Sequence, residues 1–181
     1  MNDTSRIPVV AFVGSSDSGK TTVVEGLVRE MTSRGRRVAT VKHHTHDFDI
    51  DIPGKDSWRH AQAGARVSMV SGPTKLGMVR RLERELTLSE LAAVAAVDAE
   101  ILIAEGFKAA AHRRIEVARR ERSRELVSDP ANLIALVTDD THDVGPVPVF
   151  ALDDFAGLAT FLERSFLTQG APGLADSCTE D

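Results

Sequence analysis

The sequence predicts an α/β fold in which a mostly parallel central sheet is flanked by helices. Apolar runs of strand length alternate with stretches whose apolar residues recur at helical spacing. Two of these runs, within residues 100–105 and 133–138, are apolar throughout at residues 101–104 and 133–137, as expected of strands buried on both faces of a parallel sheet. The chain has 181 residues, 42% of them hydrophobic, so we expect one domain over residues 1–167 and a disordered tail over residues 168–181.

A glycine-rich loop lies between the first predicted strand and the first predicted helix. Residues 7–13 predict a buried strand, residues 20–33 a helix that ends at Gly35, and residues 37–42 a second strand. Between strand and helix, residues 14–22 read Gly-Ser-Ser-Asp-Ser-Gly-Lys-Thr-Thr, which matches the phosphate-binding loop in its strand-loop-helix setting. We therefore predict a P-loop NTPase fold.

The residues of this loop predict a nucleoside triphosphate bound with Mg²⁺. Gly14 and Gly19 would let backbone N–H groups point at phosphates beside a helix N-terminus. Lys20 would reach the β- and γ-phosphates and Thr21 would bind Mg²⁺. The other predicted nucleotide-binding residues of the loop are Ser15, Asp17, Ser18 and Thr22.

The alternation of strands and helices continues along the chain. Further helices are expected at residues 56–63, 88–97 and 154–166, and further strands at residues 67–70, 76–79, 100–105 and 133–138. Residues 114–119 alternate polar and apolar side chains, which predicts an edge strand or hairpin arm with one wet face. Residues 147–150 predict a short edge strand, because Pro148 cannot donate to a ladder.

An acid ends one of the predicted buried strands. Glu105 would lie at the sheet edge beside the phosphates, where it is a candidate for Mg²⁺ or its water shell, although an acid at a strand end can also be merely solvated. Gly106 would let the backbone pass close to the γ-phosphate, and Lys108 would add positive charge.

A loop dense in histidine and aspartate follows the second strand. Residues 42–51 hold three histidines and three aspartates, and the carboxyl end of a parallel strand is expected to face the nucleotide. The aspartates suit Mg²⁺, whereas histidines suit zinc, nickel or hydrogen bonds to anions. The candidate metal ligands here are Asp49 and Asp51, and the further functional candidates are Lys42, His43, His46 and Lys55.

Two later segments have both a functional and a structural interpretation. Thr138, Asp139 and Asp140 follow a buried strand where a carboxylate could accept guanine N–H groups, although adjacent acids also form turns. Six arginines between residues 113 and 124, interleaved with glutamates, predict either a salt-bridged solvent face or a dock for an anionic partner.

Composition excludes several classes of function. Cys178 is the only cysteine, which excludes an internal disulfide framework and a cysteine-based zinc cluster. A net charge of −5 gives no sign of nucleic-acid binding. The chain has no apolar run of membrane-spanning length and no secretory signal, so we expect a cytoplasmic protein without a membrane partner.

Together these residues resemble the molybdopterin-guanine dinucleotide biosynthesis protein B family, which binds GTP through a P-loop. The resemblance covers nearly the whole chain before the tail. It is carried by Gly14 to Thr22, by Lys42-His43 and the His/Asp run, by residues 49–57, by Ala63-Gly64-Ala65, by Glu105 to Lys108 and by Ile115-Glu116-Val117. Two segments depart from the family's pattern: the order of histidines at residues 44–46, and Ala109-Ala110-Ala111.

The resemblance implies GTP and Mg²⁺ as cofactors, weak GTP hydrolysis at most, and a homodimer. It also implies assistance to the guanylyltransferase that joins GMP to molybdopterin, and molybdopterin itself is a further candidate ligand. The alternatives from the residues are a nickel or zinc metallochaperone GTPase, suggested by the histidines, and an ATP-dependent ligase of dethiobiotin-synthetase type, suggested by the loop.

Overall fold

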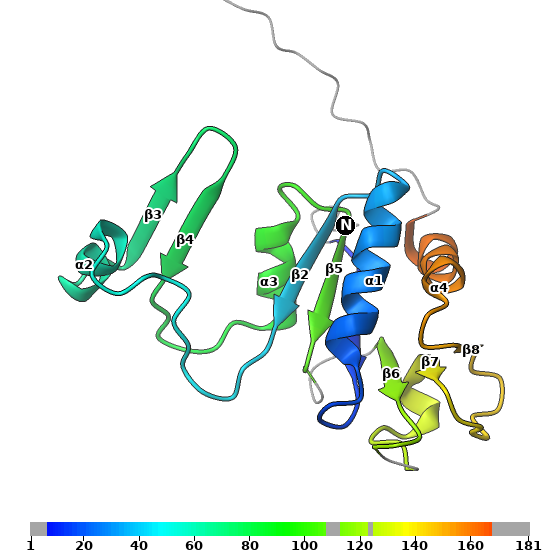
Figure 1. Cartoon of the computed structure of the whole chain (residues 1–181). Coiled ribbons are helices and arrows are strands. Elements are labelled where there is room, and N and C mark those ends of the chain that lie inside the picture. The colour runs from blue at the N-terminus through cyan, green and yellow to red at the C-terminus, as the bar shows by residue number, and fades with distance from the viewer. Residues whose placement is uncertain (1–6, 108–112, 123–124, 168–181) are drawn as a thin grey trace, which may run out of the picture. The chain divides into compact units, whose positions relative to one another are not determined.

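The computed structural model describes residues 7–107, 113–122 and 125–167, whose contacts group into two units (Figure 1). The first unit runs to His43 and resumes at Leu88, and the second unit is residues 44–87. The single domain over residues 1–167 therefore stays a prediction. The predicted tail, residues 168–181, lies outside the described residues.

A six-stranded sheet in which every pairing is parallel forms the centre of the first unit. Its strand order is β2-β5-β1-β6-β7-β8. The strands are β1 (Val9–Val13), β2 (Val38–Lys42), β5 (Ile101–Glu105), β6 (Arg114–Ala118), β7 (Leu133–Thr138) and β8 (Val149–Phe150). Because all strands are parallel, their carboxyl ends meet along one edge, where ligands bind in open α/β sheets.

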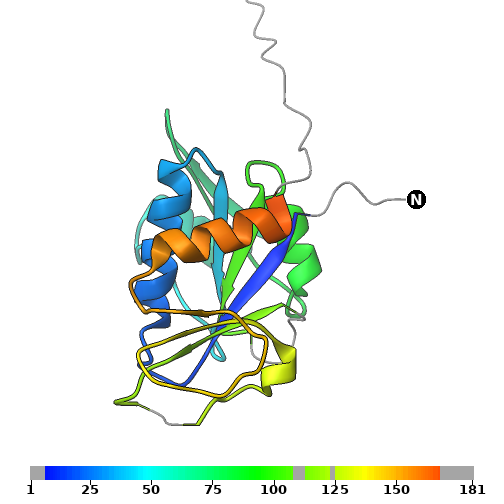
Figure 2. The same ribbon diagram turned by 90° about the vertical axis from the view of Figure 1, so that its right-hand side faces the viewer.

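Helices cover both faces of this sheet. Helices α1 (Lys20–Ser33) and α4 (Phe155–Leu162) lie side by side on one face, where their apolar residues join those of the strands in the main core (Figure 2). A side chain at Gly26 would overlap the Phe155 ring, so the glycine allows α1 and α4 to approach closely. Helix α3 (Leu88–Ala95) packs its Leu88 against Ala11 and Ala104 of the sheet in a separate cluster.

The predicted strand at residues 114–119 is confirmed as β6 (Arg114–Ala118), but its predicted edge position and wet face were wrong. Strand β6 lies between β1 and β7, not at an edge. Its polar residue Glu116 is only 1% exposed, because the carboxylate accepts hydrogen bonds from the Val127 and Ser128 N–H groups at 2.7 and 2.9 Å. A buried glutamate that accepts hydrogen bonds from a loop therefore gives the same alternation of polar and apolar residues in the sequence as a strand with one solvent-exposed face.

The remaining short elements complete the first unit. A 3₁₀ turn, η1 (Pro130–Asn132), leads into β7, and a π-helical turn, η2 (Glu163–Leu167), follows α4. Asp154 caps α4 by accepting a hydrogen bond from the Gly157 N–H. No helix in the described part of the chain is long and apolar enough to cross a membrane.

The second unit is a helix and an antiparallel hairpin. Helix α2 (Asp56–Gln62) precedes strands β3 (Val67–Ser71) and β4 (Leu76–Arg80). The Ser68 hydroxyl, on one face of the hairpin, donates to the Ser57 carbonyl of α2 at 2.9 Å. The opposite face presents Val67, Met69, Leu76 and Met78, all of which are exposed.

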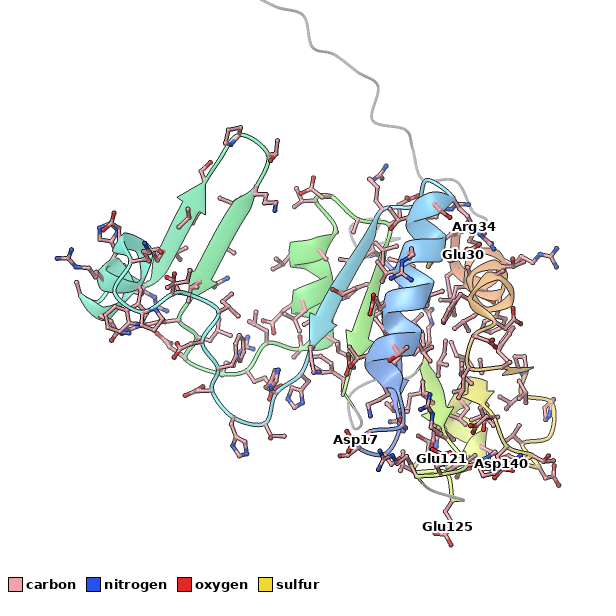
Figure 3. The ribbon with its side chains drawn as sticks, in the orientation of Figure 1. Asp17, Glu30, Arg34, Glu121, Glu125 and Asp140 are labelled. Atoms are coloured by element: carbon pink, nitrogen blue, oxygen red, sulfur yellow. The ribbon has the colours of Figure 1, made fainter. Side chains whose placement is uncertain are left out.

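A cluster of ion pairs fixes the end of α1 to the segment after α4. Arg34, labelled with Glu30 in Figure 3, contacts both Glu30 and Glu163, at 2.7 and 2.9 Å. Arg36 donates to the other oxygen of Glu163 at 2.7 Å. The hydrogen bond from Arg36 is the main reason that the pKa of Glu163 lies below its ordinary value, and the bond from Arg34 acts in the same direction.

We expect Glu163→Gln to lower the free energy of unfolding by about 1 kcal/mol at neutral pH, since it breaks two partly buried charged contacts. A lowered pKa in the folded state stabilises the protein above the unfolded glutamate pKa of about 4.3. The difference between wild type and variant should therefore shrink as pH falls below about 5 toward the folded-state pKa. Urea unfolding at a series of pH values measures this difference in the free energy of unfolding.

Glu25→Gln is the matched control, because Glu25 pairs with Arg29 on an exposed surface. Its effect should be close to zero. Equal losses for the two variants, or a loss for Glu163→Gln that does not change with pH, would contradict this account of the cluster.

Candidate nucleotide site

The predicted phosphate loop joins β1 to α1 at the edge where the strands end. Gly14, Asp17 and Gly19 all have positive φ angles, of 147°, 58° and 89°. A side chain at Gly14 would overlap the Val117 carbonyl oxygen of β6 and lie 2.9 Å from the Ser18 hydroxyl. Glycine is therefore required at position 14 both by the backbone angle and by the neighbouring strand.

The N-terminus of α1 is open to an anion. Gly19 occupies the N-cap position, no side chain caps the helix, and its first turn contains no acid. The first N–H groups of a helix have no partners within the helix and carry partial positive charge. An anion such as phosphate would accept hydrogen bonds from these N–H groups and would be attracted by their positive charge.

Lys20 places its ammonium group over this loop. Its Nζ donates to the carbonyl oxygens of Gly14 and Ser15, at 3.3 and 2.6 Å. Ser15 also accepts a weak bond from the Ser18 N–H at 3.4 Å, so the loop is folded on itself. The Ser18 side chain is completely buried and its hydroxyl has no hydrogen-bond partner among the described residues.

Thr21 and Glu105 come together although they are 84 positions apart in the sequence. The Thr21 hydroxyl donates to Glu105 Oε1 at 2.9 Å, and Lys42 Nζ lies 3.3 Å from the same oxygen. The parallel pairing of β2 with β5 sets Lys42 opposite Glu105, at the carboxyl ends of both strands. A cavity of about 330 Å³ adjoins these three residues, between α1 and strands β2 and β5.

This oxygen pair fits Mg²⁺, which prefers hard oxygen ligands and keeps several waters. Among the described residues, no three histidine, cysteine, aspartate or glutamate side chains are grouped so that they could hold a metal ion. A Mg²⁺ at Thr21 would therefore take its other ligands from phosphate oxygens and water.

His43 and Gly106 support the end of β5. The His43 N–H donates to the Glu105 carbonyl at 2.9 Å, and its ring lies 4.9 Å from that of Phe107. Gly106 has a φ of 95°, and a side chain added there would lie 3.5 Å from the His43 carbonyl oxygen. These contacts give His43 a structural role beside Glu105, and Lys108 lies outside the described residues.

The other candidates of the His/Asp loop belong to the second unit. Asp51 Oδ1 accepts from the Ile52 N–H and the Ser57 hydroxyl, at 2.8 and 3.0 Å, while Oδ2 is buried without a partner among the described residues. Lys55 is the N-cap residue of α2, and His46 is exposed. Asp49 and Asp51 line a cavity of about 570 Å³ with Trp58 of α2. Their part in a metal shell stays a prediction.

The segment predicted to read the base is held by one arginine. Arg120 donates its N–H to Asp139 Oδ1 at 2.8 Å and its Nε to Asp140 Oδ1 at 3.2 Å. The hydrogen bond from the Thr141 N–H is the main cause that lowers the pKa of Asp140, and Arg120 adds to it. The Thr138 hydroxyl accepts from the Asp140 N–H, so it shapes the turn. Asp139 is exposed, so it is a better candidate than Thr138 or Asp140 for binding the base.

Figure 3 shows Asp17 and Asp140 at the same end of the first unit, where the strands end. Arg119 and Arg120 also follow β6 at this edge, although sequence reasoning treated the basic stretch as one surface. The signal that could have separated them is position, because Arg119 directly follows β6, which pairs with β1, and β1 leads into the phosphate loop. Arg113, before β6, instead stacks on Phe166 at 4.8 Å.

Comparison with known proteins identifies the family. The model of the family described as "Molybdopterin guanine dinucleotide synthesis protein B" matches residues 9–139. The chain belongs to this family. The match includes every strand and helix that forms the site described above.

Named relatives and solved structures agree with this assignment. The chain is 33% identical over 164 residues to the molybdopterin-guanine dinucleotide biosynthesis adapter protein of Escherichia coli, covering 87% of this chain and 93% of the relative. It is 31% identical over 153 residues to the probable adapter protein of Bacillus subtilis, with coverages of 81% and 87%. The crystal structure of Bacillus subtilis MobB superposes with a TM-score of 0.69 at 28% identity, covering 87% and 98% of the two chains. The predicted P-loop NTPase fold is confirmed.

We expect Gly14→Ala to destabilise the protein by about 2–4 kcal/mol, since it adds both a strained φ and an overlap with the Val117 carbonyl. Gly35→Ala is the control, because Gly35 also has a positive φ, of 79°, but nothing lies near its missing side chain. That variant should lose only about 1 kcal/mol. Chemical denaturation measures the free energy of unfolding of both variants. Equal losses would contradict the close packing of the loop against β6.

Proposed function

We propose that this chain is a GTP-binding adapter in the synthesis of molybdopterin guanine dinucleotide and that it acts in the cytoplasm. Membership of the family and the names of its relatives support the pathway. The observation that carries the nucleotide proposal is the contact between the Thr21 hydroxyl and Glu105 beside an uncapped helix N-terminus. This arrangement joins a phosphate cradle to an oxygen pair suited to Mg²⁺.

In this proposal different residues of the loop bind different parts of GTP and its Mg²⁺. Backbone N–H groups of residues 14–22 hold the phosphates, and Lys20 exchanges its carbonyl partners for β- and γ-phosphate oxygens. Thr21 and Glu105 hold Mg²⁺, directly or through water, and the ion neutralises phosphate charge. Lys42 then compensates the charge of Glu105 from the β2 side.

Hydrolysis of GTP is proposed to be slow. Hydrolysis in such sites depends on a residue that orients the attacking water. In this proposal Glu105 is committed to Mg²⁺ with Thr21 and is paired with Lys42, so we assign it no role in orienting the attacking water. Binding of GTP, rather than its turnover, is therefore the main activity that we propose.

Guanine preference is assigned to the loop after β7. We propose that Asp139 accepts the N1–H and 2-amino groups of guanine, a pair of donors that adenine lacks. Its exposure supports this assignment, as does the Arg120 N–H that fixes one of its oxygens.

The proposed partners are the guanylyltransferase of the pathway, molybdopterin and a second copy of this chain. The exposed apolar face of the hairpin supports the homodimer: Met69 and Met78 oppose each other on it and are 61% and 46% exposed. Exposed apolar faces often mark contacts between proteins, and a hairpin alone is only marginally stable. Light scattering should give the mass of two chains, and the mass of one chain would contradict this proposal.

We expect Lys20→Ala to raise the dissociation constant for GTP by about tenfold or more, because it removes a charged contact to the phosphates. Calorimetry with GTP, GDP and ATP in the presence of Mg²⁺ measures this, and GTP should bind more tightly than ATP. Lys75→Ala is the control, since Lys75 is an exposed lysine in the turn of the hairpin. Unchanged GTP affinity in Lys20→Ala would contradict the nucleotide proposal, and equal affinity for ATP would contradict the assignment of guanine.

A further inference from the structure

Arg119 lies against the phosphate loop from the β6 side. It follows the last residue of β6, and its guanidinium group lies next to the position where Gly19 lacks a side chain. The distances from that position to Nη2, Cζ and Nε of Arg119 are 3.5, 3.8 and 4.0 Å. The positive charge of Arg119 therefore stands at the N-terminus of α1.

Contacts within the described part of the chain do not explain this position. Nε of Arg119 is buried without a hydrogen-bond partner among the described residues, and no ion pair joins the side chain to another of them. The next residue, Arg120, contrasts with it because Asp139 and Asp140 satisfy its side chain and backbone.

Both features are unfavourable in the free protein. A cation is disfavoured at the positive end of a helix, and the first turn of α1 carries no acid to offset it. A buried N–H group without a partner also loses the hydrogen bonds that water would have made. An anion placed between Arg119 and the loop would remove both costs, and a guanidinium group matches phosphate oxygens well.

We propose that Arg119 binds a phosphate group at the nucleoside end of the bound nucleotide; this inference rests on the proposed function. The order of strands decides which phosphate it meets. Glu105 ends β5 on one side of β1, whereas Arg119 follows β6 on the other side, toward the β7 loop that holds Asp139. Arg119 thus stands on the base side of the loop, away from the oxygen pair for Mg²⁺.

This position makes Arg119 a binding and positioning residue rather than a group that acts on the γ-phosphate. A contact at the nucleoside end is present with GDP as well as GTP. Loss of the contact should therefore weaken both nucleotides by the same factor, whereas a group on the γ-phosphate would affect GTP alone.

The test compares Arg119→Met with Arg122→Met in the full chain. Both variants remove one positive charge, and Arg122 is an exposed residue of the same loop. Calorimetry with GTP and with GDP should show both dissociation constants raised by about tenfold to a hundredfold in Arg119→Met and unchanged in Arg122→Met. The salt dependence of binding should also become weaker in Arg119→Met only.

Thermal unfolding without nucleotide distinguishes a role of Arg119 in binding the nucleotide from a role in stabilising the phosphate loop. Because the buried Nε of Arg119 has no hydrogen-bond partner among the described residues, Arg119→Met should unfold at the same temperature as wild type or higher. A lower unfolding temperature, unchanged affinities, or a loss confined to GTP would each overturn the inference while leaving the nucleotide proposal intact. Wild type that binds neither GTP nor pyrophosphate would overturn the proposed function and this inference together.

Discussion

The close approach of Gly14 to the Val117 carbonyl oxygen sets the position of the phosphate loop. The absence of a side chain at Gly14 lets the loop lie directly against the end of β6. The start of α1 is thereby held at the edge where four neighbouring strands end, in the order β5-β1-β6-β7. Each functional group of the site comes from one of these strand ends, from the end of β2 beside β5, or from the first turn of α1, so the parallel sheet determines their arrangement.

This arrangement separates two electrostatic tasks. On the β5 side, a carboxylate, a hydroxyl and an ammonium group converge within hydrogen-bonding and ion-pairing distance, which suits a hydrated cation. On the β6 side, the uncapped helix and an unpartnered guanidinium group concentrate positive charge, which suits phosphate. This concentration of positive charge destabilises the free protein, since no described side chain neutralises it. Stability given up in the free state is a common property of binding sites.

Sequence reasoning succeeded where local pattern and topology act together. The helical spacing after Lys20 predicted α1 from residue 20 to residue 33. The position of Glu105 at a strand end predicted that it would lie at the sheet edge beside the phosphate loop, where it contacts Thr21. Sequence reasoning failed where a residue's partner comes from a distant segment. Glu116 was taken for a wet residue because the N–H groups that satisfy it belong to Val127 and Ser128. Arg119 could not be separated from its basic neighbours, because a missing partner is visible only in three dimensions.

The central claim is that the loop at Gly14 to Thr22 holds the phosphates of GTP while Thr21 and Glu105 hold Mg²⁺. A crystal structure of the protein with a non-hydrolysable GTP analogue and Mg²⁺ tests it most directly. The account predicts phosphates over the N-terminus of α1, Mg²⁺ within ligand distance of the Thr21 hydroxyl and the guanine ring beside Asp139. A nucleotide bound elsewhere, or a metal ion away from Thr21 and Glu105, would contradict it.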